Sequence, residues 1–243
     1  MILPSYSYLL RSGSDECVEF LLECGADIHA KDRYNRNVLM GASAECSKRI
    51  VRLLLESGAI QGINDQDTSG HTALMEAAIK GKAENLKYLL DNGANLNLST
   101  HIGTHFFANT DWYLYFASDR SDGEGGGQTA LMMASNSECI QILLDAGANV
   151  NTYDKAGRNA LLFQCLFYRN EQSVKQLISA GSHLYKNLND GKLLPYLASI
   201  YSDYDRNPQI IEMLINAGCT DVEESEVYGD RENFAYYFTP DRR

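Results

Sequence analysis

Two histidines, His101 and His105, lie four positions apart and are followed by Asp111, so together they offer the nitrogen and oxygen ligands of a metal site. A spacing of four residues brings two ligands to one face only on a helix. Gly103 lies between the histidines and disfavours a helix there. We therefore expect no metal ion at these residues.

The glycine-rich residues 123–127 have the composition of a phosphate-binding loop. The run lacks the Gly-Lys-Ser/Thr ending, however, and carries Glu124 where a phosphate would lie. A flexible linker is the better interpretation. The sequence also contains no recognisable nucleophile elbow, H-E-x-x-H motif or histidine-associated reactive cysteine. It therefore predicts no cofactor and no enzymatic activity.

Net charge restricts the class of partner. The chain has 21 lysines and arginines against 32 aspartates and glutamates, a net charge of −11. Such a surface repels a phosphate backbone, so we expect no nucleic-acid partner, and it favours capture of a basic protein. No stretch of about 18 apolar residues is present, and residues 1–6 lack the basic region of a secretory signal. We therefore expect no membrane association.

The cysteines and most histidines are expected to be structural rather than reactive. The six cysteines have apolar surroundings typical of helices and form no C-x-x-C pair: Cys17, Cys24, Cys46, Cys139, Cys165 and Cys219. Free buried thiols in a reducing compartment explain them better than disulfides or a zinc site, so we expect a cytoplasmic protein. His29, His71 and His183 fall at turn positions, where we expect them to lie on the surface.

One phrase recurs six times along the chain: two aliphatic residues, two variable residues, a glycine and a small residue. The aliphatic pair is typical of the end of an amphipathic helix, and the glycine suits a left-handed C-cap. Four of the five intervals between these glycines lie close to 33 residues, which predicts stacked structural repeats. The glycines are Gly25, Gly58, Gly93, Gly147, Gly181 and Gly218.

A second phrase marks the start of the following helix, where threonine or asparagine can cap the N-terminus. Turn-forming residues lie just before these starts, at 32–35, 67–70 and 154–157. Each unit is therefore predicted to be a helix pair preceded by a projecting turn. The helix starts are Thr72-Ala73-Leu74, Thr129-Ala130-Leu131, Asn159-Ala160-Leu161 and, more loosely, Asn37-Val38-Leu39.

This unit resembles the ankyrin repeat, whose pattern is a Thr-Pro-Leu-His-like helix start, a Leu-Leu-x-x-Gly-Ala helix end and a protruding β-turn. The resemblance covers roughly residues 4–219. It implies an all-α solenoid of stacked helix pairs with β-turn fingers and one long insertion. We expect residues 1–219 to form the array and residues 220–243 to form an acidic, aromatic C-terminal cap.

Two smaller departures from the repeat predict changes in helix length and position. Thr129 precedes Gly147 by 18 residues, whereas Thr72 precedes Gly93 by 21, so the first helix of the fourth pair is expected to be a turn shorter. Pro208 suits the first turn of the last repeat helix.

The largest departure is an insertion of about 22 residues within the turn at 99–127. Large aromatic side chains are enriched at protein interfaces because they bury a large area at little cost in rotamer entropy. The alternative is that they fold back as a hairpin packed on the neighbouring repeat, and a mixture of both is expected. The aromatic residues of the insertion are Phe106, Phe107, Trp112, Tyr113, Tyr115 and Phe116.

The resemblance also implies where a partner binds, because ankyrin arrays use the turn tips and the first helix of each pair. The tip residues carried over are Arg33, Tyr34, Arg36, Thr68, Ser69, His71, Lys155, Ala156 and Arg158. The first-helix residues are Ser43, Glu45, Ile79, Lys80, Ser135, Asn136, Tyr168, Tyr201 and Tyr204. Several tips are basic although the chain is acidic.

The implied function is that of a protein-protein interaction module, monomeric when free. Small acidic ankyrin proteins resemble the immunity proteins that bacteria pair with secreted toxins. This favours a stoichiometric inhibitor of a toxin or enzyme with a basic surface. The alternative is an adaptor or scaffold that recruits a partner and has no catalytic activity.

Overall fold

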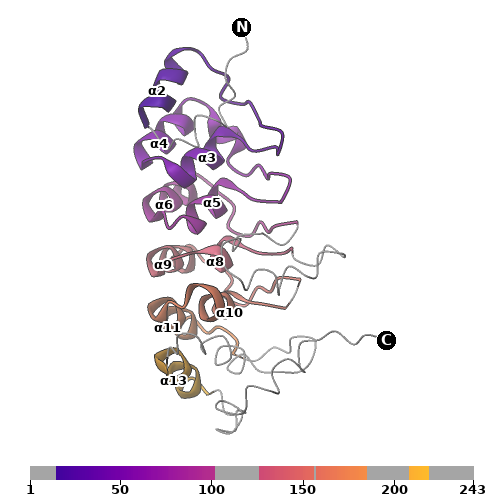
Figure 1. Cartoon of the computed structure of the whole chain (residues 1–243), viewed down its shortest axis with the longest axis vertical. Coiled ribbons are helices and arrows are strands. Elements are labelled where there is room, and N and C mark those ends of the chain that lie inside the picture. Colours follow the sequence, from indigo (N-terminus) through magenta and orange to yellow (C-terminus); the bar gives the residue numbers. More distant parts are fainter. Residues whose placement is uncertain (1–14, 102–125, 156, 185–207, 219–243) are drawn as a thin grey trace, which may run out of the picture.

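The computed structural model describes residues 15–101, 126–155, 157–184 and 208–218 of the 243-residue chain. In these parts the helices form pairs that stack in one direction (Figure 1). α2 (Asp15–Glu23) precedes the described pairs, and α13 (Pro208–Asn216) ends the stack. The pairs are α3 (Val38–Glu45) with α4 (Lys48–Glu56), α5 (Ala73–Ile79) with α6 (Ala83–Asp91), α8 (Ala130–Met133) with α9 (Ser137–Asp145), and α10 (Ala160–Phe163) with α11 (Glu171–Ser179). A 3-10 turn, η1 (Ala59–Gly62), follows α4, and a π-helical turn, η2 (Gln164–Tyr168), continues α10.

The helices form two columns. The first helices α3, α5, α8 and α10 pack on one another in sequence order, and so do the second helices α4, α6, α9, α11 and α13. The turns that join successive pairs project to one side of the stack (Figure 1). β-pairing in the described residues is confined to two isolated bridges, so the predicted all-α repeat solenoid is confirmed. Among these residues no helix combines the length and apolarity needed to span a bilayer.

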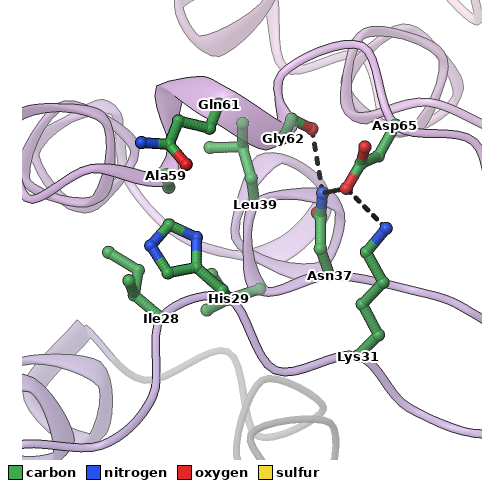
Figure 2. Close-up of a pocket in the computed structure, with 10 residues that line it drawn as sticks. Ile28, His29, Lys31, Asn37, Leu39, Ala59, Gln61, Gly62 and Asp65 are labelled. Atoms are coloured by element: carbon green, nitrogen blue, oxygen red, sulfur yellow. Dashed lines mark hydrogen bonds and ion pairs between the residues drawn. The ribbon is translucent and has the colours of Figure 1, made fainter.

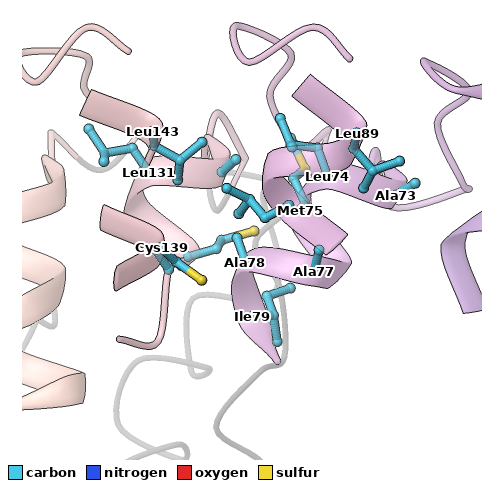
Figure 3. Close-up of a cluster of buried hydrophobic side chains, with 14 of the residues drawn as sticks. Ala73, Leu74, Met75, Ala77, Ala78, Ile79, Leu89, Leu131, Cys139 and Leu143 are labelled. Carbon is cyan, nitrogen blue, oxygen red and sulfur yellow. The ribbon is translucent and has the colours of Figure 1, made fainter. Parts of the chain in front are cut away.

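A continuous apolar core joins the repeats, because one helix pair cannot bury its own apolar face. Figure 3 shows the junction between α5 and its neighbours, where Met75 and Leu131 come from consecutive pairs. Ala77 and Ala78 are both 0% exposed, and these small side chains allow close helix approach. Leu89, the first aliphatic residue of the repeated phrase in α6, is also 0% exposed.

Both predicted helix-end signals are present. All six repeat glycines have positive φ, between 72° and 115°, as a left-handed C-cap requires. The side chains of Asn37, Thr72 and Asn159 accept a hydrogen bond from the backbone N–H three residues later, which confirms them as N-caps. Thr129 has the extended backbone of an N-cap, but its side chain makes no capping bond.

The fourth pair has the shortened first helix that the sequence predicts, since α8 has four residues and α5 has seven. The loop that follows the short α8 forms hydrogen bonds to the preceding pair. The Ser135 N–H donates to the Ala78 carbonyl at 3.0 Å, and Asn136 Nδ2 donates to the Gly81 carbonyl at 3.1 Å. Pro208 is the first residue of α13, also as predicted. The expected C-terminal cap at 220–243 lies outside the described residues.

Candidate protein-binding surface

An aspartate organises each of three projecting turns, which we name finger one (31–37), finger two (65–71) and finger four (153–159). The third turn in the row carries the insertion. In each turn the aspartate N–H donates to the carbonyl four residues later. Its carboxylate accepts backbone N–H bonds of 2.8 to 2.9 Å: Asp32 from Tyr34 and Arg36, Asp67 from Ser69 and His71, and Asp154 from Arg158. These bonds fix the turn geometry locally.

Finger one is fixed to finger two. Asn35 has φ of 61°, a left-handed conformation that asparagine tolerates, and this places its side chain against the neighbouring finger. Figure 2 shows the ion pair at the base of the junction. The contacts between the fingers are Thr68 N–H to Tyr34 O at 2.9 Å, Asn35 Nδ2 to Gln66 O at 2.7 Å, Lys31 Nζ to Asp65 Oδ2 at 2.8 Å, and Asn37 Nδ2 to Asp65 Oδ2 at 3.2 Å.

A cavity of about 240 Å³ lies beside this junction, with His29 and Gln61 among its lining residues and the buried side chain of Leu39 behind them (Figure 2). The loop between Gly58 and Asp67 is two residues longer than the equivalent loops that lead to fingers one and four. Residues of η1 within this longer loop line the cavity.

The insertion leaves the array through a closed neck formed by residues 99–101 and 126–129. Ser99 and Thr129 form an antiparallel bridge, and backbone bonds join Thr100 to Gln128 and Gly127. A Cβ on Gly126 would lie 2.4 Å from the carbonyl oxygen of His101, so only glycine fits there.

The neck is also bonded to the fingers on both sides. The His101 N–H donates to the Ser69 carbonyl of finger two at 2.9 Å. The Lys155 N–H of finger four donates to the Gly126 carbonyl at 2.9 Å. The two ends of the insertion are therefore held in the row of fingers. The six aromatic residues predicted to contact a partner all lie outside the described residues, as do His105, Asp111, Ala156, Tyr201 and Tyr204.

Among the predicted partner-binding residues, Arg33 and Tyr34 are exposed at the tip of finger one. The Tyr34 side chain is 49% exposed, and the Arg33 guanidinium carbon lies 4.7 Å from the centre of its ring. Arg36 is half-buried on the same finger. Lys80 is exposed and forms an ion pair of 2.9 Å with Glu45 of the preceding pair.

Arg158 and Tyr168 make structural contacts instead of standing free. The Nε and Nη2 atoms of Arg158 each lie 2.7 Å from Asp154 Oδ2, and its guanidinium carbon lies 5.0 Å from the ring centre of Phe163. The Tyr168 hydroxyl donates to the Met133 carbonyl at 2.7 Å, and burial raises the pKa of this phenol well above its usual value.

His71 corrects the expectation of a surface histidine, because it is only 8% exposed. Its Nδ1 lies 3.1 Å from Oε1 of the buried Glu76, and its backbone N–H bonds Asp67. Ligand atoms of these three residues lie within 4.8 Å of one another, a grouping that the sequence reasoning missed despite the i,i+4 spacing of Asp67 and His71. The hydrogen bonds within finger two account for this arrangement.

Burial corrects three further expectations. Ser43 and Ile79 were expected on the binding face, but they are 0% and 6% exposed because neighbouring first helices cover them. Cys24 was expected to be buried and is exposed, since it lies beyond the end of α2. Cys46, Cys139 and Cys165 are buried free thiols, as predicted.

Asparagines that bond the next repeat were missed from the sequence. Asn64 accepts from the Asn95 N–H at 2.7 Å, and its Nδ2 donates to the Gly93 carbonyl at 3.3 Å. Asn151 does the same to the next pair, accepting from His183 N–H and donating to Gly181 O. Asn151 lies four residues after Gly147, and Asn64 lies six residues after Gly58 in the loop that is two residues longer, so the recurrence of asparagine at this position was a signal that could have revealed it.

Comparison with known proteins gives matches along most of the chain. The family model described as "Ankyrin repeats (3 copies)" matches residues 7–100 and 109–190. The chain is 34% identical over 141 residues to an ankyrin repeat domain-containing protein of Stachybotrys chartarum, covering 57% of this chain and 6% of that protein. It is 21% identical over 238 residues to a putative ankyrin repeat protein of Acanthamoeba polyphaga mimivirus, covering 93% of this chain and 64% of that protein.

A third relative is the transient receptor potential cation channel subfamily A member 1 of Homo sapiens, 26% identical over 198 residues, covering 73% of this chain and 17% of the channel. The chain thus spans less than two thirds of each of these relatives. The repeated phrases, the stacked helix pairs and the family match agree. The chain belongs to the ankyrin-repeat family, whose repeats are protein-protein interaction modules.

Proposed function

We propose that the chain binds one partner protein through its row of fingers and through the aromatic insertion that leaves the neck between fingers two and four. The observation that carries this proposal is the neck itself. It closes the insertion with backbone hydrogen bonds and is bonded to both neighbouring fingers, so residues 102–125 start and end within the finger row. The partner contacts in this proposal are the six insertion aromatics together with Arg33, Tyr34, Arg36, Lys80 and Tyr201.

We further propose that binding blocks the partner, as a stoichiometric inhibitor of a toxin or enzyme with a basic surface would. The net charge of −11 supports this, because it speeds encounter with a basic protein. The proposal includes a monomeric free state and a cytoplasmic location, which the buried free thiols of Cys46, Cys139 and Cys165 support. The alternative, an adaptor, is favoured by the small share of the fungal and channel relatives that the chain covers.

The insertion is tested by removing it at the neck. The partner is first captured from the native organism by affinity purification and identified. An Asn-Gly dipeptide then replaces residues 102–125 and joins His101 to Gly126, because Asn-Gly suits a two-residue turn between antiparallel segments. Loop-closure entropy changes by about 0.6 kcal/mol for each doubling of loop length, so the shortened array should keep its thermal midpoint.

The expected result is a partner affinity at least tenfold lower, equivalent to about 1.4 kcal/mol. Unfolding of the shortened protein would instead mean that the aromatics pack on the array. Normal folding with normal affinity would leave recognition to the fingers and first helices alone.

Titration separates the inhibitor from the adaptor. An inhibitor abolishes the activity of the purified partner at a 1:1 ratio, and the gene of an immunity protein lies directly beside the gene of its toxin. An adaptor leaves the partner active at saturation. Either result is read from the same assay, with the shortened variant as the control for binding-dependent effects.

A further inference from the structure

Finger one carries two arginines that have no acidic partner within the part of the chain that the structure describes. Neither Arg33 nor Arg36 lies within 4.0 Å of a carboxylate among the described residues. Three other described arginines are paired: Arg49 with Glu19 at 2.6 Å, Arg52 with Glu56 at 3.8 Å, and Arg158 with Asp154 at 2.7 Å. Two guanidinium groups with no acidic partner in the described part of the chain therefore lie on one turn of a protein whose net charge is −11.

The carboxylates of fingers one and two are already occupied. Asp32 accepts hydrogen bonds from two backbone N–H groups of its own turn, and Asp67 does the same in finger two. Asp65 accepts from Lys31 and from the side-chain amide of Asn37. Turning any of them toward Arg33 or Arg36 would break bonds that hold the fingers, so none of these three carboxylates neutralises the positive charge at the tip.

The tip is also preorganised. Arg33 lies over the Tyr34 ring at 4.7 Å, and the four contacts of finger one with finger two fix the backbone below them. Figure 2 shows the Lys31–Asp65–Asn37 network that anchors its base. A group ordered before binding loses less conformational entropy on association. The tip thus combines an exposed aromatic face with two planar donors suited to carboxylates.

We propose that finger one binds an acidic segment of the partner protein, with Asp or Glu carboxylates held by Arg33 and Arg36 and an adjoining apolar side chain packed on the Tyr34 ring. This inference rests on the proposed function and adds the chemistry of one contact. The partner then presents an acidic patch to finger one even if the rest of its surface is basic. A nucleic acid is disfavoured at the same tip, because the net negative charge repels a long phosphate chain.

The test uses a decaglutamate peptide as the probe, titrated into the full-length ¹⁵N-labelled chain at about 20 mM salt, where charge interactions are weakly screened. Binding is followed by NMR through the amide signals of residues 31–37 and the Nε–H signals of the arginines. The variant is Arg33→Gln/Arg36→Gln. The matched control is Arg52→Gln/Lys87→Gln, which removes the same charge from exposed positions on α4 and α6.

We expect the wild type and the control to bind decaglutamate with equal affinity and to shift the signals of residues 31–37. The finger variant should bind at least tenfold more weakly. The single variant Arg33→Gln serves the same comparison if the double variant has a lower unfolding midpoint. Equal binding by the finger and control variants would overturn the proposal, as would shifts spread evenly over all arginines.

A phosphoserine peptide of matched charge is the second probe. Tenfold tighter binding of this peptide than of decaglutamate would make the tip a phosphopeptide site and would also overturn the proposal. The outcome is separate from that of the insertion test. If decaglutamate fails to bind while removal of the insertion still weakens partner capture, the proposed function stands without this contact.

Discussion

The side-chain amide of Asn85 donates a hydrogen bond of 3.0 Å to the backbone carbonyl of Cys46, 39 positions earlier in the chain. The same nitrogen also donates to the Ser43 carbonyl at 3.1 Å. Both acceptors lie at the C-terminal end of α3, where carbonyls have no partner within the helix. Asn85 is 2% exposed, so one buried amide in α6 satisfies the end of a helix in the preceding repeat.

Replacing Asn85 with alanine should destabilise the array by about 1–3 kcal/mol, because two buried carbonyls lose their donor. Chemical denaturation followed by circular dichroism measures the loss. Asn92→Ala is the matched control, since the side-chain amide of Asn92 donates to the Tyr88 carbonyl of its own helix, α6, and not to another repeat. It should change stability by less than about 0.5 kcal/mol. Equal effects of the two changes would mean that the inter-repeat bond contributes nothing.

Replacing Leu89 with alanine should reduce the free energy of unfolding by about 2–5 kcal/mol, because the side chain is fully buried between repeats. Lys87→Ala on the same helix is the control, since Lys87 is exposed. The control should stay within about 0.5 kcal/mol of the wild type. A small loss for Leu89→Ala would contradict the position of α6 in the stack.

The sequence predicts the repeats well because each repeat position has a local physical cause. Positive φ at Gly93 and the side-chain cap of Thr72 depend on neighbours within a few residues, and both can be inferred from residue type. The shortening of α8 follows from counting residues between Thr129 and Gly147. Such features need no knowledge of how one repeat contacts the next.

Features of the candidate surface were harder to predict, because exposure depends on contacts between repeats. His71 is in a turn by sequence, yet Glu76 in the following helix pairs with it and the stack covers it. Arg158 is a residue type common at protein interfaces, but its guanidinium forms an ion pair with Asp154 four positions earlier. The insertion that contains Trp112 could be located from the interval between repeats alone. Its contacts with a partner stay a prediction.

Cysteine reactivity should follow burial. Burial raises the pKa of the Cys139 thiol to about 12 and that of Cys46 to about 11, whereas Cys24 is exposed. The thiolate is the reacting species, and at pH 8 a thiol with a pKa of about 12 is deprotonated in about one molecule in ten thousand. Iodoacetamide at pH 8 should therefore label Cys24 before Cys46 and Cys139.

Peptide mapping by mass spectrometry measures this order of labelling. The control is the same reaction in guanidinium, where unfolding should make all the thiols react at similar rates. Labelling of Cys139 as fast as Cys24 in the native protein would contradict the burial of α9 against its neighbours.

Arg158 and Arg33 were both predicted to bind a partner, and they make different contacts within the array. Asp154 keeps only 1% of its side chain exposed and has both nitrogens of the Arg158 fork at 2.7 Å. Arg158→Gln removes this charged partner and should destabilise the array by about 1–3 kcal/mol. Arg158→Lys should recover little of the loss, because an ammonium cannot form the same two bonds.

Arg33→Gln should leave stability within about 0.5 kcal/mol, since Arg33 is exposed. Thermal denaturation of the three variants tests the distinction. Full stability of Arg158→Gln would contradict this prediction. It would show that the array does not need the Arg158 guanidinium, which would then be as available to a partner as that of Arg33.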